Sequence, residues 1–307
     1  MSELSARQLN ELIVQNLGNP EGLEKVAEAN NTYIRTKLRE TSFTRKIVPP
    51  QYVTKVDLHP SVNHDGLVKI VEIEPDASAM TVNFLGQANA EYIRGERYAI
   101  PFFTISSKDY QKNEKELLAY DLPFTDIVEK NSLLEIQRIE DTHIMAQVDA
   151  AIAVEVAKGN VTAQTGTYAS DGSIKKGDFK KLFDTLDSNE LNAEVILMDR
   201  TTYNRLFIWD ATTVGDALGN ELTVNGYTYG TLFGRKLVVS NKVSLLQNKI
   251  YVFTAPEYFA QFLILDDTKF FIEKKRNIIT FNVYEDIGFG IGNTAAAGVL
   301  TFTGTDS

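Results

Sequence analysis

The strongest constraint on the fold is a single long helical segment between Pro123 and Gly159. Pro123, Thr125 and Asp126 are favourable residues at the start of a helix, and Gly159 is a natural stop. A helix from Phe124 to Ala157 would be a rod about 51 Å long at ~1.5 Å per residue. A rod of this length needs another extended element to lie along.

Apolar residues recur along one side of this segment, and acidic residues occupy much of the rest. The apolar side chains are Leu133, Ile136, Ile144, Val148 and Ile152. The acidic ones include Glu129, Glu135, Glu140, Asp141 and Asp149. The segment lacks sustained heptads, which disfavours a coiled coil, and it is too acidic for a fully buried helix. The pattern therefore predicts a helix with one apolar face lying across a sheet.

Upstream, the stretch HPSVNHDG (residues 59–66) predicts the turn of a β-hairpin. Its predicted arms are Tyr52–Leu58 and Leu67–Glu74, which are rich in Val and Ile. Arms of this length would project roughly 27 Å at ~3.4 Å per residue. An isolated two-stranded hairpin is marginal in water, and both arms carry charged side chains. We therefore expect this hairpin to rest on another part of the structure or on another chain.

The remaining segments predict an α+β fold. Residues 1–40 contain two amphipathic helical patterns, Ser5–Leu17 and Gly22–Arg39, which resemble an arm that docks elsewhere. Pro101 interrupts a strand-like run and indicates an edge strand or a bulge. After Gly159, short helical and strand patterns alternate, and long strand patterns return near the end of the sequence.

Composition limits the classes of function. The 307 residues carry a net charge of −10, which is the wrong overall sign for a dedicated nucleic-acid binder. Cysteine is absent, which excludes disulfides and thiolate metal sites. No apolar run is long enough to span a bilayer, so no membrane partner is expected.

No catalytic, cofactor-binding or metal-binding motif emerges from the sequence. His59 and His64 flank the predicted turn, but their spacing matches no recognised metal site, and a solvated turn is the favoured interpretation. His143 lies among charged neighbours on the long helix. The acidic pairs Asp266-Asp267 and Glu285-Asp286 would need a cleft to act as glycosidase carboxylates, and neighbours on a strand point to opposite faces. GFGIGNTAAAG (residues 288–298) predicts a tight strand turn rather than a phosphate-binding loop.

Two basic clusters allow two interpretations. The first comprises Arg35, Lys37, Arg39, Arg45 and Lys46, and the second comprises Lys274, Lys275 and Arg276. They could contact nucleic acid, or they could form salt bridges between subunits with the many carboxylates of this protein. The net charge favours salt bridges.

The order of these segments resembles the major capsid proteins of tailed bacteriophages, which have the Hong Kong 97-type shell fold. AEVILMDRTTYNRL resembles the strand-then-helix segment of the axial domain, and LFGRKLVVSNKV resembles its glycine-strand-serine segment. The resemblance implies an α+β chain of four parts. These are an N-terminal arm (1–40), an extended hairpin or E-loop (41–76), a peripheral domain with a spine helix 124–157 (77–160 and 266–287), and an axial domain (161–265 and 288–307).

The resemblance also implies a function without catalysis. The chain would form hexamers and pentamers of an icosahedral virion shell around double-stranded DNA, without sequence-specific binding and without a cofactor. Portal, scaffold and decoration proteins are the implied partners, and assembly would occur in the host bacterial cytoplasm. An encapsulin-type compartment is the alternative, and a hydrolase is a remote one. The hairpin would lie on the neighbouring subunit through Val56, Leu58, Val68 and Ile70.

Two details differ from some members of that family. Glu285 and Asp286 stand where many of those proteins carry arginines on the return strand, which puts an inherited salt bridge between subunits in doubt. Lysine is absent from the predicted turn, and only Lys55 and Lys69 lie in its arms. We therefore expect no covalent lysine–asparagine mesh between subunits.

Overall fold

The structure is a computed structural model of the chain. It describes residues 42–303, except for 62–65, 76, 78, 84, 85, 88, 91, 119–123, 171 and 209–230. The predicted N-terminal arm, His64 and the basic residues Arg35, Lys37 and Arg39 lie outside the described residues.

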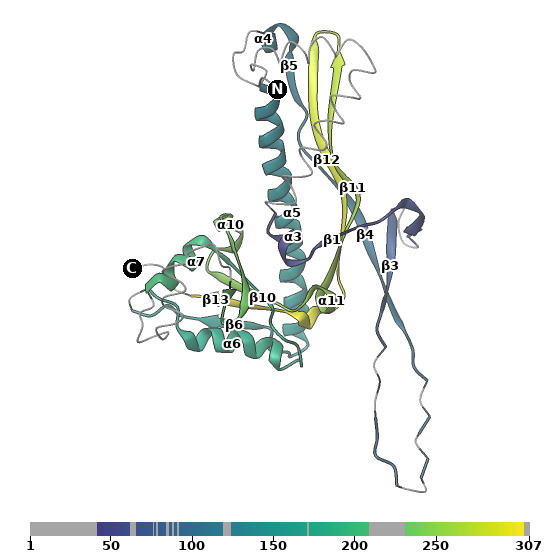
Figure 1. Cartoon of the computed structure of the whole chain (residues 1–307), viewed down its shortest axis with the longest axis vertical. Coiled ribbons are helices and arrows are strands. Elements are labelled where there is room, and N and C mark those ends of the chain that lie inside the picture. Colours follow the sequence, from purple (N-terminus) through teal and green to yellow (C-terminus); the bar gives the residue numbers. More distant parts are fainter. Residues whose placement is uncertain are drawn as a thin grey trace, which may run out of the picture.

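A long helix and a long sheet run side by side through one part of the molecule (Figure 1). The helix, α5, spans Phe124–Ala157, as the sequence predicts. It lies against β12 (Ile278–Ile291), which forms an antiparallel pair with β11 (Ala260–Lys275). The five predicted face residues are all buried in the main core, with exposed fractions of 3% or less. The apolar stripe of α5 therefore fixes which side of the helix the sheet covers.

The long sheet has seven strands in the order β1-β11-β12-β4-β3-β2, with β5 also paired to β12. Its shorter strands are β1 (Pro50–Tyr52), β2 (His59–Pro60), β3 (Leu67–Ile73), β4 (Glu96–Ser106) and β5 (Tyr110–Asn113). The short helices of this region are α3 (Thr44–Ile47), η1 (Lys55–Asp57) and α4 (Glu114–Leu118).

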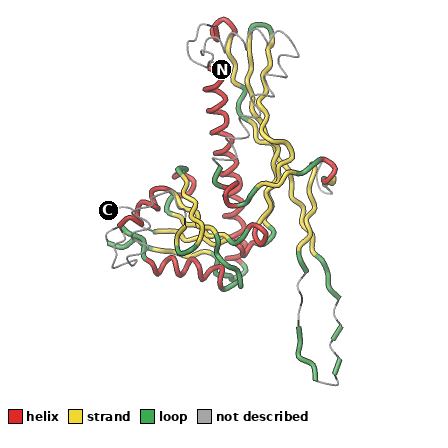
Figure 2. The backbone as a smooth tube through the Cα atoms, in the orientation of Figure 1, coloured by secondary structure: helices red, strands yellow, loops and turns green. Residues whose placement is uncertain are grey.

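The projecting hairpin is built from β3 and β4, not from the two arms that the sequence predicts. Tyr52–Leu58 is largely irregular and includes η1, so the prediction of a first strand there is wrong. Only His59 and Pro60 pair with β3 on that side, around a turn in which the Ser61 amide donates to the Gly66 carbonyl. β3 instead pairs with β4 from Val68 to Ile73, and the connection between these strands projects far from the body of the molecule (Figures 1 and 2).

Pro101 stands where β4 changes partners. From Phe102 to Ser106 the strand pairs with β12, and from Glu96 to Pro101 it pairs with β3. Proline has no amide hydrogen to donate to a ladder, so it fits where one set of pairings ends and the next begins. The hairpin therefore leaves the long sheet at Pro101, where the sequence predicts an edge strand or a bulge.

The second part of the molecule is a six-stranded sheet in the order β6-β13-β10-β7-β9-β8. Its strands are β6 (Ala163–Gly166), β7 (Val195–Asp199), β8 (Thr231–Leu232), β9 (Arg235–Ser240), β10 (Lys249–Phe253) and β13 (Ala297–Phe302). Its helices and turns are α6 (Lys176–Asp187), α7 (Arg200–Asn204), η2 (Arg205–Ile208), α10 (Val243–Leu246), α11 (Pro256–Phe259) and η4 (Thr294–Ala296). Asp199 caps α7 by accepting hydrogen bonds from the amides of Thr201 and Thr202.

Two hydrophobic clusters cover the two faces of the second sheet. One face joins the core under α5 through side chains such as Leu197 and Phe253. The other carries Ile196, Val252 and Leu300 and packs under α6. β7 is buried at all five positions, and burial explains the uninterrupted apolar run of its first four residues. The connection of residues 288–298 is a strand end, η4 and a strand start, as the sequence predicts.

Candidate functional site

The hairpin exposes apolar side chains on β3 and close to its base. Leu67, Ile70 and Ile73 on β3 are each more than a third exposed, and Val56 in η1 is 90% exposed. Scattered apolar residues on a surface are ordinary, but these lie together on one projecting element. Tyr92 and Ile93, in the connection between β3 and β4, are also exposed. The hairpin therefore carries apolar side chains, on both faces of β3, that the other described residues leave exposed.

The four predicted contact residues fall into two groups. Val56 and Ile70 are exposed, with fractions of 90% and 44%. Leu58 and Val68 are only 8% and 5% exposed, so they are already buried within their own chain and leave little surface for a neighbour. The prediction assigned all four to a contact between subunits because it paired Tyr52–Leu58 with β3. In the structure, Val68 faces Pro101 of β4 and His59 of β2.

The charged residues of the hairpin are partly paired across its own strands. Glu72 and Arg97 lie opposite each other on β3 and β4, with 2.8 Å between Oε1 and Nη2. Both side chains are more than two-thirds exposed, so this pair contributes about 0–1 kcal/mol to stability. The ion pair is consistent with the register of β3 and β4, in which Glu72 and Arg97 are direct partners.

Five charged side chains from distant parts of the chain meet in the interior, beside α3. We call this group the ionic junction: Arg45, Glu140, Asp141, Lys242 and Glu285. Arg45 Nη2 lies 2.8 Å from Glu140 Oε2 and 3.1 Å from Glu285 Oε2. Lys242 Nζ lies 2.5 Å from Asp141 Oδ2. The three carboxyl groups belong to fully buried residues.

Hydroxyl groups add further hydrogen bonds to the junction. Ser42 Oγ donates to Glu140 and Asp141 at 2.9 Å each, and Thr44 Oγ1 donates to Asp141. Thr268 Oγ1 donates to Glu285 Oε2 at 3.0 Å. Since buried charges are tolerated only when they are paired and hydrogen-bonded, these contacts make the junction specific to one arrangement of its elements.

Burial dominates the electrostatics of the junction. It raises the pKa of Asp141, although Lys242 and Thr44 oppose that effect. Burial, followed by the charge of Glu140, raises the pKa of Glu285 to about 8. Burial also opposes the charge of Arg45, but Glu140 and Glu285 outweigh it and raise the pKa of the guanidinium.

Sequence reasoning did not find this junction. The sequence places Arg45 in a basic cluster for which salt bridges between subunits are the favoured interpretation, and it places Glu140 and Asp141 among the acidic residues of the long helix. A signal was available: Glu140 is four residues after Ile136 and four before Ile144, so helical periodicity places it on the apolar stripe. A carboxylate in that position is buried and requires a cation.

The histidines, acidic pairs and basic residues that the sequence analysis considered as possible site residues do not come together in one site. His59 is exposed in β2, and His143 stacks on Phe103 with ring centroids 4.6 Å apart. Asp286 accepts a hydrogen bond from Thr104, while Glu285 points into the ionic junction, so the pair faces opposite sides of its strand as predicted. Lys274 of the second basic cluster pairs with Glu114 of the same chain. Within the described ranges, no three potential ligands come together as a metal site.

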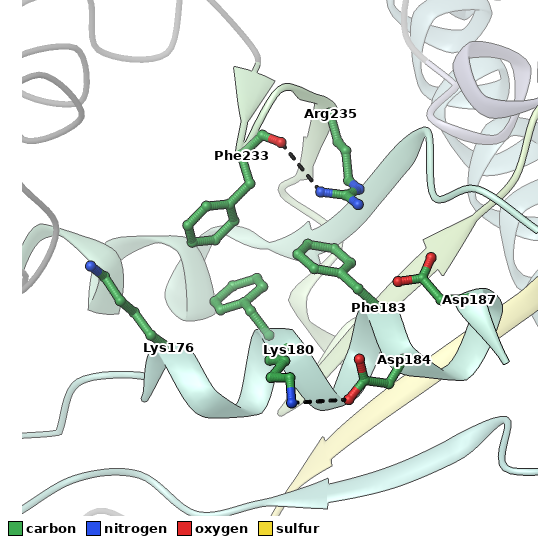
Figure 3. A pocket seen from close by; sticks show the side chains of 8 residues that line it. Lys176, Lys180, Phe183, Asp184, Asp187, Phe233 and Arg235 are labelled. Atoms are coloured by element: carbon green, nitrogen blue, oxygen red, sulfur yellow. Dashed lines mark hydrogen bonds and ion pairs between the residues drawn. The ribbon is translucent and has the colours of Figure 1, made fainter.

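A groove of about 280 Å³ lies beside α6 (Figure 3). Phe179, Phe183 and Phe233 form its apolar wall, and the guanidinium carbon of Arg235 lies 3.9 Å from the centre of the Phe183 ring. Lys180 and Asp184 at its rim pair with each other at 3.9 Å. Its lining contains no activated nucleophile and no histidine.

No helix in the described part of the chain has the length and apolar character needed to cross a membrane.

Sequence comparisons find no match to a family model or to a curated protein. Comparison of structures does find similar chains. A structure from Mycobacterium phage Bobi has a TM-score of 0.63 at 9% sequence identity, covering 86% of this chain and 91% of that one. One from Microbacterium phage Oxtober96 has a TM-score of 0.60 at 12% identity, with the same two coverages. The capsid of the native GTA particle has a TM-score of 0.57 at 12% identity, covering 86% and 90%.

This chain has the Hong Kong 97-type shell fold. We call α5 the spine helix, the part of the chain that contains the long sheet the peripheral domain, and the part that contains the six-stranded sheet the axial domain. The α+β class predicted from the sequence is confirmed.

Proposed function

We propose that this protein is the major capsid protein of a tailed bacteriophage, and that its subunits form the pentamers and hexamers of an icosahedral shell around double-stranded DNA. Its role is structural rather than catalytic. Its location is the virion, after assembly in the cytoplasm of a bacterial host. Portal, scaffold and decoration proteins are the further partners that this role implies.

The observation that carries the proposal is the uncovered apolar surface of the hairpin on a chain with this fold. Leu67 and Ile73 lie on one face of β3 and Ile70 on the other, because successive residues of a strand point to opposite faces, and Val56 precedes them in η1. Covering them is favourable by roughly 25 cal/mol per Å² of apolar area. A neighbouring subunit supplies that cover, so the hairpin lies over the peripheral domain of the next chain.

Several modest contacts of this kind are sufficient in a closed shell. Each interface loses rotational and translational freedom and orders side chains, which offsets much of the burial. In a closed shell the same contact repeats around every capsomer, so each subunit is held by several neighbours at once. The phage and GTA capsid matches favour a viral shell over an encapsulin-type compartment.

The net charge of −10 fits a wall that surrounds DNA without binding it. Like charge between wall and phosphate backbone disfavours adhesion of the packaged DNA. The ionic junction also argues against strong DNA binding at Arg45, because this cation is buried and satisfied by carboxylates of its own chain.

Sedimentation velocity of three proteins tests the proposal. The first is the full chain, the second carries Ile70→Ser and Ile73→Ser on the hairpin, and the third is a control. We expect the full chain to sediment as capsomers or shells, and the double variant to shift to smaller species. Val154→Ser and Val156→Ser, at exposed apolar positions of the spine helix, are the matched control. Identical small species for all three proteins would contradict the proposed assembly.

A further inference from the structure

The ionic junction joins three parts of the molecule at one point. Arg45 lies in α3, within residues 42–48 at the start of the described part of the chain. Glu140 and Asp141 are consecutive residues of the spine helix, and Glu285 lies on β12 of the long sheet. Lys242 is the residue before α10 in the axial domain. We refer to residues 42–48 as the arm root.

The arm root has few other polar ties to the rest of the molecule. Lys236 Nζ, on β9, donates to the Lys46 carbonyl at 2.7 Å. The Lys242 ammonium lies 5.6 Å from the centre of the Phe43 ring. The remaining polar contacts of the arm root run to Glu140, Asp141 and Glu285 through Ser42, Thr44 and Arg45. Phe43, Ile47 and Val48 also hold the arm root, because they are buried in the main core. The state of the three carboxyl groups therefore modulates how firmly the arm root is held, through its polar contacts.

Charge counting shows that the carboxyl groups cannot all be ionised without cost. Two cations, Arg45 and Lys242, face the carboxyl groups of Glu140, Asp141 and Glu285. Asp267 on β11 adds another negative group near Arg45, and it accepts hydrogen bonds from the Tyr52 hydroxyl and the Thr268 amide. An excess of buried carboxylates over cations is relieved when one carboxyl keeps its proton.

Geometry identifies Glu285 as that carboxyl group. It shares the single nitrogen Nη2 of Arg45 with Glu140, whereas Glu140 also receives Arg45 Nε at 3.1 Å. Its atom Oε1 is buried and has no hydrogen-bond partner among the described residues. A full negative charge on Glu285 would thus be the least compensated charge in the junction.

We propose that Glu285 and Glu140 form a buried proton-binding site, and that the bound proton holds the arm root against the spine helix and β12. Loss of this proton leaves two adjacent buried carboxylates competing for one guanidinium nitrogen, which loosens Arg45 and the segment around it. The arm root is thereby a pH-dependent latch that is held most firmly in acid and loosens as pH rises towards 8. This inference does not depend on the proposed function.

The direction of the pH effect follows from linkage. The folded chain holds a proton on Glu285 that the unfolded chain releases, because the pKa of Glu285 is raised in the folded state. The stabilising contribution is fully present below the ordinary pKa of glutamate and is lost as pH rises through about 8. Over that interval, closure of the latch weakens by up to about tenfold per pH unit.

Infrared spectroscopy of the full chain detects the proton directly. We expect the wild type to show the carbonyl band of a protonated carboxyl group at pH 6.5 and to lose it above pH 8, and we expect Glu285→Gln to lack it. Asp286→Asn, the adjacent carboxyl on the same strand, should keep the band. Absence of the band from the wild type, or its persistence in Glu285→Gln, would overturn the proposal.

Hydrogen exchange supplies the readout for the arm root. The amides of Lys46, Ile47 and Val48 are hydrogen-bonded within α3 and report its opening. After correction for intrinsic rates, their protection should fall up to tenfold per pH unit towards pH 8 in the wild type and in Asp286→Asn. It should be independent of pH in Glu285→Gln. If this variant does not fold, the wild-type curve still decides, because constant protection from pH 5.5 to 9 would refute the latch.

Discussion

At the scale of single residues, Glu155 fastens the end of the spine helix to the axial domain. Lys158 Nζ lies 2.7 Å from its Oε1, and Asn160 Nδ2 donates to its Oε2 at 2.5 Å. Thr294, just before β13, donates to the same carboxylate. These three hydrogen bonds, led by that of Lys158, lower the pKa of Glu155 to about 2. One side chain thus closes the helix and positions the last axial strand.

We expect Glu155→Gln to lower the free energy of unfolding by about 1–3 kcal/mol at pH 7, because charge-assisted hydrogen bonds are lost. The depressed pKa means that this contribution is present above the ordinary pKa of glutamate and disappears as pH falls through about 2. The difference between wild type and variant, measured by denaturant unfolding of unassembled subunits, should shrink in acid. Glu135→Gln removes an exposed ion pair with Arg138 and is the control. Equal effects of the two substitutions would refute this role for Glu155.

Gly234 is a second position where one residue matters. Its φ of +75° lies in the left-handed region, in the turn between β8 and β9, although no atom lies where a Cβ would be placed. We expect Gly234→Val to destabilise the subunit by about 1–3 kcal/mol through backbone strain alone. Gly177→Ala, at an uncrowded position of α6 without a positive φ, should be neutral or stabilising by up to about 1 kcal/mol. An unchanged melting temperature for Gly234→Val would contradict this explanation.

At the scale of elements, the register of the hairpin suggests a clean deletion. Ile73 and Glu96 are directly paired across β3 and β4. Replacing residues 74–95 by Asn-Gly would close these strands with a two-residue turn and leave the long sheet intact. We expect the isolated subunit to keep its circular dichroism and cooperative melt, while shells fail to form. A lower melting temperature with normal shells would show that the connection supports its own chain instead.

The elements also show what the sequence could and could not predict. The spine helix follows from local signals, since its periodicity, its proline start and its glycine stop lie within the segment itself. The pairing of β3 could not be read locally. His59 and Pro60 do pair with the start of β3, but β4, about thirty residues further on, provides the longer partner for β3. The ionic junction was missed for the same reason, because Arg45, Glu140 and Glu285 are far apart in sequence and meet only after the sheet and helix pack.

At the scale of the whole molecule, cohesion between subunits should be non-covalent. The connection of residues 74–95 contains no lysine, and Lys69 lies within β3. We expect assembled protein boiled in detergent to run as a single band of 34.3 kDa on a denaturing gel. A ladder of oligomers that survives boiling would refute this expectation.

Cryo-electron microscopy of the purified full chain tests the central claim most directly. The account predicts closed shells of pentamers and hexamers, in which the β3–β4 hairpin of each subunit lies over the peripheral domain of its neighbour and covers Ile70 and Ile73. Particles that remain monomers at every concentration would contradict it. So would shells in which the hairpin folds back on its own subunit and leaves those side chains exposed.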